Sequence, residues 1–181
     1  NQPQMEEIRR QLLEKAVLMC EAMLSQESQQ PEVRRRTADA SLRLGRIRSL
    51  LGQDERADQS AQNAVQILTE LVSDNLHEPR YRKLLVEAYL SQGDFLARRG
   101  QYSRAAETCR VAITKCEPRT TGEEKQLGLT RAQANHKLGL LLRTLGRYGE
   151  AEACLRSAIG LCEAAPSDSP ETLRQLAASS A

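Results

Sequence analysis

The stretch that decides the fold is AQANHKLGLLLRTLGRYGEAEACLRSAIGLCE, residues 132–163. Two of its four glycines, Gly139 and Gly146, lie seven positions apart, and alanines follow five and twelve positions after Gly146. The same spacing occurs twice more upstream, so the three sets are Gly45, Gly52, Ala57, Ala64; Gly93, Gly100, Ala105, Ala112; and Gly139, Gly146, Ala151, Ala158. Three copies of one spacing indicate an array of repeated helical units.

The two glycines of each set have different expected roles. The first falls inside a predicted helix, where glycine costs roughly 1 kcal/mol relative to alanine. Three such glycines in register predict a close approach of the paired helix. The second glycine is predicted to end the helix in a turn. The fold class predicted from this pattern is all-α, a right-handed α-solenoid of antiparallel helix pairs with elongated helices.

The second half of the leading helix, together with the residues that follow it, aligns without gaps on a later part of the chain. Residues 16–35 match residues 64–83, an offset of 48 positions. We interpret the leading helix as the second half of a degraded or truncated repeat. Pro31 and Pro79 each occupy the first position of a following helix. We expect helices at about 3–27, 31–51, 54–74, 79–100, 102–116, 121–145 and 148–163. The expected domains are a leading helix at 1–30, repeats at 31–77, 78–118 and 119–163, and a loop with a C-terminal capping helix at 164–181.

Apolar spacing predicts which side chains these helices bury. In the second helix of the first repeat, the inward face is expected to comprise Ala57, Ala61, Ala64, Ile67, Leu68 and Leu71. The leading helix is expected to be amphipathic, with its apolar residues at Ile8, Leu12, Ala16, Met19 and Met23.

Composition narrows the class of protein. The chain has 26 basic and 24 acidic residues, a net charge of +2, and 3% aromatic residues. This balance argues against a nucleic-acid surface, and no apolar run approaches the roughly 18 residues of a membrane span. The five cysteines, an odd number with no CxxC motif, fit reduced thiols in the cytoplasm. Because the sequence begins at Asn1 rather than at a methionine, we expect it to be a piece of a longer chain.

The pattern LG(x)6GRYGEAEACLRSAI, residues 138–159, resembles the tetratricopeptide repeat (TPR). Residues on the signature positions are Leu138, Gly139, Leu142, Tyr148, Ala151, Leu155 and Ala158. The periods of 48 and 46 exceed the 34 of that family, and such long helices resemble the repeats of kinesin light chains. PRYRKLLVEAYLSQGDFLARRGQYSRAAE, residues 79–107, is similar to the C-terminal repeat regions of planctomycete-type bacterial serine/threonine protein kinases. This resemblance implies a regulatory piece of a signalling protein, because the chain has none of the kinase's catalytic motifs.

No set of residues suggests chemistry. The two histidines lie in different predicted repeats. His77 is in a predicted loop beside Glu78 and is interpreted as solvated, and His136 has no Asp or Cys at ligand spacing. The basic run Arg34, Arg35, Arg36 follows Glu32 and lacks aromatic neighbours, so we interpret it as solvated helix surface. We therefore expect the fragment to be no enzyme, with no cofactor and no metal site.

The expected functional feature is the concave face lined by the first helix of each repeat. Its mixture of charge and leucine suits an extended peptide or a helix of a protein partner. The candidate residues are Asp39, Leu42, Arg46, Ser49, Glu87, Leu90, Asp94, Gln133, His136, Leu140 and Arg143, with Ala97 in the same register. The predicted function is a non-catalytic protein–protein interaction or regulatory module. The alternative is a structural spacer or a homodimerisation arm that pairs through the repeat ends. No nucleic-acid or membrane contact is expected.

Overall fold

The computed structural model describes residues 2–24, 29–76, 78–117 and 121–164. Over these ranges the chain forms seven helices and no strands, which confirms the all-α prediction. Each helix begins within one residue of the expected position. The helices are α1 (Gln2–Leu24), α2 (Pro31–Leu50), α3 (Asp54–Asp74), α4 (Pro79–Arg98), α5 (Tyr102–Lys115), α6 (Thr121–Thr144) and α7 (Tyr148–Glu163). The capping helix expected within residues 164–181 lies outside the described residues.

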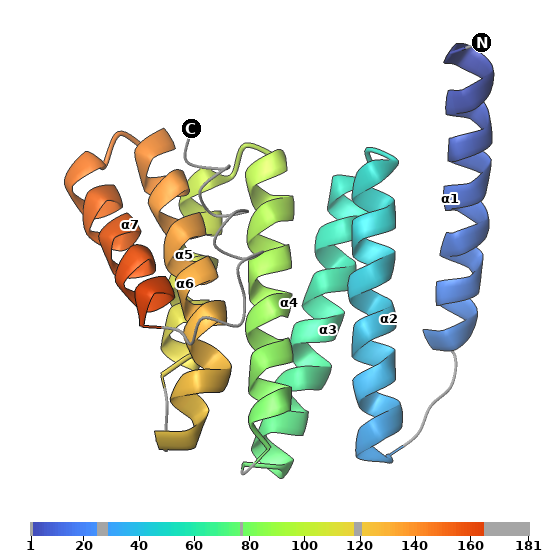
Figure 1. Cartoon of the computed structure of the whole chain (residues 1–181). Coiled ribbons are helices and arrows are strands. Elements are labelled where there is room, and N and C mark those ends of the chain that lie inside the picture. Colours follow the sequence, from blue (N-terminus) through green and yellow to red (C-terminus); the bar gives the residue numbers. More distant parts are fainter. Residues whose placement is uncertain (1, 25–28, 77, 118–120, 165–181) are drawn as a thin grey trace.

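The helices stand side by side in chain order, with α1 at one end of the row and α7 at the other (Figure 1). Consecutive helices contact each other throughout, and α2 and α6 also contact α4. We call α2, α4 and α6 the first helices and α3, α5 and α7 the second helices. The arrangement is a one-dimensional stack, in which each helix pair rests on its neighbours.

Three identical turns join the first helices to the second helices. Gly52, Gly100 and Gly146 have φ values of 73°, 73° and 74°. After each glycine the next amide donates to a carbonyl oxygen five positions earlier, as from Gln53 to Arg48 at 2.8 Å. This bond is the hallmark of the Schellman motif, in which a left-handed residue ends the helix. The predicted role of these glycines is confirmed.

The mid-helix glycines lie where two helices approach closely, as predicted. A Cβ atom on Gly45 would lie 3.1 Å from the carbonyl oxygen of Ala57 and 3.1 Å from the ring of Phe95. On Gly139 it would lie 2.7 Å from Cγ of Leu155. Since protein interiors are close-packed, neither position has room for a side chain.

The core consists of two hydrophobic clusters that share α4. Leu85 and Phe95 of α4 pack in the first cluster with α2 and α3. Val86 and Leu90 of the same helix pack in the second cluster with α5, α6 and α7. Because α4 is buried on both sides, the two clusters form one continuous core along the stack.

The prediction that the cysteines are small buried apolar residues is confirmed for three of the five, whereas Cys20 and Cys154 are only partly buried. All five are free thiols, and Cys109, Cys116 and Cys162 are buried. Burial raises the pKa of Cys109 and of Cys116 to about 12, so both thiols stay protonated and weakly nucleophilic at neutral pH. The Sγ atom of Cys109 would lie 3.3 Å from a Cβ atom on Gly93, which marks another close helix contact.

The leading helix differs from the others. The apolar side chains of Ile8, Leu12 and Met19 are 52%, 62% and 71% exposed. Although α1 contacts α2, nothing in the described chain covers this face. A periodic apolar pattern identifies a face suited to burial, but burial also requires a second element to pack against it.

Candidate functional site

The predicted site residues fall into four sets, each occupying the same register position in the three first helices. The repeat offsets of 48 and 46 residues relate the members of each set. The sets are Asp39, Glu87, Gln133; Leu42, Leu90, His136; Arg46, Asp94, Leu140; and Ser49, Ala97, Arg143. We call the surface of α2, α4 and α6 on which they lie the first-helix face.

One set is buried in all three repeats. Leu42 is 4% exposed, Leu90 5% and His136 9%. Leu42 packs in the first core cluster and Leu90 in the second. These residues therefore hold the helices together beneath the face, and a ligand on the folded array does not reach the two leucines.

The residues of the set that contains Ser49 differ in burial from one repeat to the next. Ser49 is 5% exposed, and its hydroxyl donates to Oδ1 of Asp54 at 2.8 Å. Its carbonyl oxygen accepts from Nη2 of Arg98 at 3.4 Å. Ser49 thus joins α2, α3 and α4, whereas Arg143, in the same register two repeats on, is exposed.

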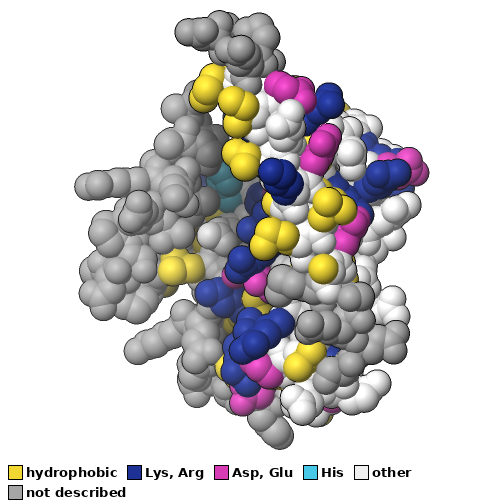
Figure 2. Space-filling view, turned by 90° about the vertical axis from the view of Figure 1, so that its right-hand side faces the viewer, with side chains coloured by type: hydrophobic (Ala, Val, Ile, Leu, Met, Phe, Trp, Pro, Cys, Tyr) yellow, Lys and Arg dark blue, Asp and Glu magenta, His cyan; other side chains and the backbone are white. Residues whose placement is uncertain are grey.

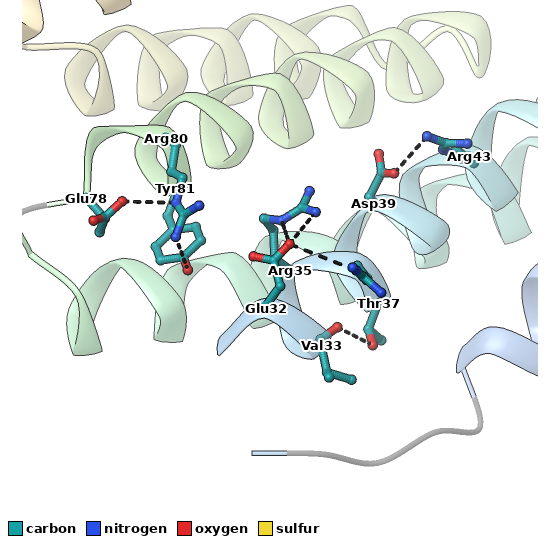
Figure 3. Close-up of polar contacts among 10 residues, drawn as sticks. Glu32, Val33, Arg35, Thr37, Asp39, Arg43, Glu78, Arg80 and Tyr81 are labelled. Atoms are coloured by element: carbon teal, nitrogen blue, oxygen red, sulfur yellow. Dashed lines mark hydrogen bonds and ion pairs between the residues drawn. The ribbon is translucent and has the colours of Figure 1, made fainter. Parts of the chain in front are cut away.

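Further accessible charges lie in the remaining two sets. Asp39 pairs with Arg43 one turn later at 3.0 Å, as Figure 3 shows. Asp94 of α4 pairs with Lys137 of α6, which links neighbouring first helices across the face. Arg46 is exposed and has no carboxylate partner in the described part of the chain. Glu87, Gln133 and Leu140 are half-buried.

The basic run Arg34, Arg35, Arg36 has carboxylate partners throughout. Arg34 pairs with Glu70 and, at 3.1 Å, with Asp74, both on α3. Glu32 accepts from Arg35 at 2.6 Å and lies 3.9 Å from Arg36, and the hydrogen bond from Arg35 lowers the pKa of Glu32. The run is therefore neutralised and does not form a free basic patch.

A second polar cluster lies beside this one at the start of α4 (Figure 3). Arg80 pairs with Glu78 at 3.0 Å, and its guanidinium lies 4.9 Å from the centre of the buried Tyr81 ring. Such a cation–π contact contributes about 0.5–1 kcal/mol at an exposed site. Together, the clusters give the amino ends of α2 and α4 a surface in which charges are already paired.

One cavity in the described structure lies away from the first-helix face. It has a volume of about 450 Å³ and is bordered by residues of α3, α4 and α5, among them Thr69, Ser73 and Thr114. Arg82, which is 4% exposed, lies at its edge and donates to the carbonyl oxygens of Lys115 and Glu117. Sequence reasoning missed this cavity, because the relative placement of α3 and α5 depends on tertiary packing. Since Arg82 binds the end of α5, its role here is structural.

His136 has a pKa below its ordinary value, first because it is buried and then because Lys137 and Arg143 lie nearby. The imidazole is therefore neutral in the folded chain at a pH where it is charged in the unfolded chain. In that range the unfolded state binds more protons, so stability decreases as the pH falls.

We expect urea unfolding to shift to lower denaturant concentration as the pH falls from about 7.5 to about 5.5, through the ordinary histidine pKa of about 6.5. The His136→Gln variant, which cannot take up this proton, should lose much of that shift. Unfolding midpoints of both proteins at the two pH values measure the effect. An equal shift in both would show that other groups cause it.

The described residues contain no group of three His, Cys, Asp or Glu side chains arranged to hold a metal ion. His77 lies outside these residues. The helices found in the same part of the chain also include none long and apolar enough to cross a membrane.

Comparison with known proteins gives one family match, over part of the chain, and several similar solved structures. Residues 132–164 match the family model of the tetratricopeptide repeat. No curated protein matches the chain. The crystal structure of BtubC (BKLC) from P. vanneervenii superposes with a TM-score of 0.60 and 18% identity, covering 74% of this chain and 50% of that chain. This chain therefore spans about half the length of BtubC, and at this identity the likeness shows the fold alone.

Two structures of MamA are also similar. The crystal structure of MamA has a TM-score of 0.36 and 18% identity, covering 70% of this chain and 78% of that chain. The structure of MamA MSR-1 C2 has a TM-score of 0.35 and 13% identity, covering 86% and 98%. The glycine turns, the close helix approaches and the match at residues 132–164 lead to one conclusion: the chain contains a tetratricopeptide repeat within an all-α array of helix pairs.

Proposed function

We propose that this chain binds a peptide or a helix of a protein partner along the first-helix face. The observation that carries the proposal is the row Arg46, Asp94, Leu140, which occupies one register position on three successive first helices. Arg46 and Asp94 are exposed, and Leu140 is half-buried. The set at Asp39, Glu87 and Gln133 runs beside it. Two parallel rows of exposed or half-buried side chains favour an elongated ligand that crosses several helices.

Charge in these rows favours a protein ligand. Basic Arg46 is followed by acidic Asp94 in the next repeat, while exposed Arg143 lies one helical turn after Leu140. A polyanion such as nucleic acid would encounter Asp39, Glu87 and Asp94 on the same surface. Complementary charges of both signs on a peptide would fix its register and speed its association.

We propose that the module belongs to a larger cytoplasmic signalling protein and is itself non-catalytic, in line with the sequence similarity to kinase-associated repeat regions. The units at 31–77, 78–118 and 119–163 are its proposed repeats. Their boundaries fall close to the starts of α2, α4 and α6, at Pro31, Pro79 and Thr121.

A structural spacer or homodimerisation arm is the second candidate. It is favoured by apolar side chains on α7, where Tyr148 is 70% exposed and Ile159 59% exposed. A second copy that stacks on α7 would bury them. A molecular mass in solution that increases with the concentration of the wild-type chain would favour this function. The Ile159→Glu variant should then have a lower mass at the same concentration.

The proposed function is tested by capture of partners from a lysate of the source cell, followed by mass spectrometry. The baits are the wild-type chain and a variant with Arg46→Glu, Asp94→Lys and Arg143→Glu. We expect a partner that the wild type retains and the variant loses. Isothermal titration with that partner's binding segment should then show at least a tenfold weaker affinity for the variant.

A matched control variant carries three equivalent charge reversals on the second helices instead of the first helices. The substitutions Arg104→Glu, Glu107→Lys and Arg156→Glu alter net charge by the same amount at exposed positions of α5 and α7. Equal helicity in circular dichroism would show that all three proteins fold. If the partner binds both variants as tightly as the wild type, the first-helix face is not the binding surface.

A further inference from the structure

The exposed side of α1 carries an apolar stripe made by Met5, Ile8, Leu12 and Met19. These side chains are 67%, 52%, 62% and 71% exposed. Their spacings of three, four and seven residues place them along one line of the helix. Figure 2 looks at this end of the array and shows hydrophobic side chains gathered along α1, the nearest helix. Leu18 is also exposed but lies outside this line.

The internal repeat identifies what kind of element fits the stripe. With the offset of 48 residues, Leu12 of α1 corresponds to Ser60 of α3, and Lys15 corresponds to Asn63. The Ser60 hydroxyl lies 2.9 Å from Nη1 of Arg48 on α2, and Asn63 donates to Ser41 of α2 at 3.1 Å. The stripe therefore occupies the side by which α3 packs against its own first helix. Met19 corresponds in the same way to Ile67, which is partly buried against the first core cluster.

The packing of α1 on α2 uses a different side of the helix. The partly buried residues Leu13, Val17 and Cys20 lie roughly a quarter of a turn or more from the stripe. Glu21 also pairs with Arg48 of α2 at 2.6 Å. Because α2 is already in place, the stripe is a separate surface that accepts another helix. Apolar side chains in a heptad-like line are the usual seam for such a helix.

Charges beside the stripe specify the partner. Arg9 and Lys15 flank it on either side, and both are exposed without a carboxylate partner in the described chain. Among the described side chains of α1, the acidic ones lie on the far side of the helix, at Glu7, Glu14 and Glu21. Glu7 and Glu14 pair there with Arg10.

A second copy of the chain fits this surface poorly. Two α1 stripes that face each other bring Arg9 and Lys15 of one chain against the same cations of the other, in either orientation. Like charges along a helix–helix seam are destabilising. The packed pair α2 and α3 shows the opposite arrangement, because Arg34 of α2 forms ion pairs with Glu70 and Asp74 of α3. On α1 the flanking charges are basic, so the incoming helix must supply the carboxylates.

We propose that the stripe of α1 binds an amphipathic helix of another protein, with acidic residues beside its own apolar stripe. The helix lies along α1 in the position that α2 takes on α3. This surface is distinct from the first-helix face, so the two can be tested separately.

The probe is a three-heptad synthetic peptide with leucine at positions a and d and glutamate at e and g, and the reference peptide carries lysine at e and g. Both peptides repel their own copies, so each stays a monomer. Fluorescence anisotropy measures their binding to the wild-type chain. We expect the glutamate peptide to bind at least tenfold more tightly than the lysine peptide. Equal affinities, or no binding of the glutamate peptide, overturn the proposal.

Three variants locate the binding. Leu12→Glu should weaken binding of the glutamate peptide at least tenfold. Leu18 is exposed on the same helix but lies outside the stripe, so Leu18→Glu should change the affinity less than about twofold. The double variant Arg9→Glu, Lys15→Glu should reverse the preference in favour of the lysine peptide. Circular dichroism checks that each variant remains helical. Equal losses for Leu12→Glu and Leu18→Glu, or an unchanged preference in the double variant, overturn the assignment.

Sedimentation equilibrium of the wild-type chain tests whether a second copy of the chain covers the stripe. We expect the mass of one chain, with no change in the Leu12→Glu variant. A dimer that Leu12→Glu dissociates would show that a second copy covers the stripe, and the acidic-helix proposal would then be wrong.

Discussion

Replacing Gly45 by alanine is expected to lower the free energy of unfolding by about 1–2 kcal/mol, although alanine is the better helix former by about 1 kcal/mol. The new Cβ atom would lie 3.1 Å from the backbone oxygen of Ala57 and 3.1 and 3.3 Å from two ring atoms of Phe95. Phe95 is 4% exposed and packed in the first core cluster, so neither neighbour can move aside easily. Urea unfolding followed by circular dichroism measures the change.

Gly160 provides the matched control. It lies inside α7, and a Cβ atom there would have no neighbour within 4 Å. Gly160→Ala should therefore raise the free energy of unfolding by up to about 1 kcal/mol, through helix propensity alone. Opposite signs for the two variants would verify the close approach of α2 to α3 and α4. If Gly45→Ala stabilises the chain as Gly160→Ala does, α2 packs less tightly than the structure indicates.

The glycines also explain how far the fold could be predicted from the sequence. A glycine inside a helix is unfavourable unless the paired helix needs the space, so its repetition at Gly45, Gly93 and Gly139 reports directly on packing. The turn glycines act in the same way, because a left-handed residue is uncommon outside glycine. Both signals link local sequence to tertiary structure, which is why the helix pairs and their limits were predicted well.

The site was less predictable. Register alone placed Leu42 and Arg46 on one surface, yet Leu42 is buried and Arg46 is exposed. Which side of a first helix faces solvent depends on how neighbouring repeats stack, and that depends on every side chain between them. The same limit applies to α1, whose stripe has the periodicity of a buried face but lacks a covering element among the described residues. Ion pairs such as Asp94–Lys137, 43 residues apart, also have no local sequence signal.

Replacing Leu68 by alanine is expected to produce the largest loss of stability, about 3 kcal/mol within the 2–5 kcal/mol that buried leucines usually show. Leu68 is 1% exposed and packs in the first core cluster between α2 and α4. Truncation removes three carbon atoms from a close-packed site and leaves a cavity that helices joined by short turns cannot easily close. Because α4 belongs to both clusters, the substitution should destabilise the whole stack of helices. Unfolding should therefore remain a single transition. Urea unfolding monitored by circular dichroism measures both the midpoint and the slope.

Leu50→Ala is the control for this substitution, since Leu50 ends α2 and is 58% exposed. The same atoms are removed there without creating a cavity, so the change should stay within about 0.5 kcal/mol. A large difference between the two variants therefore isolates the contribution of the core around Leu68. A cost for Leu68→Ala as small as that for Leu50→Ala would contradict the close packing of α3 between α2 and α4. A second, separate transition would instead mean that the two clusters unfold independently, despite the helix they share.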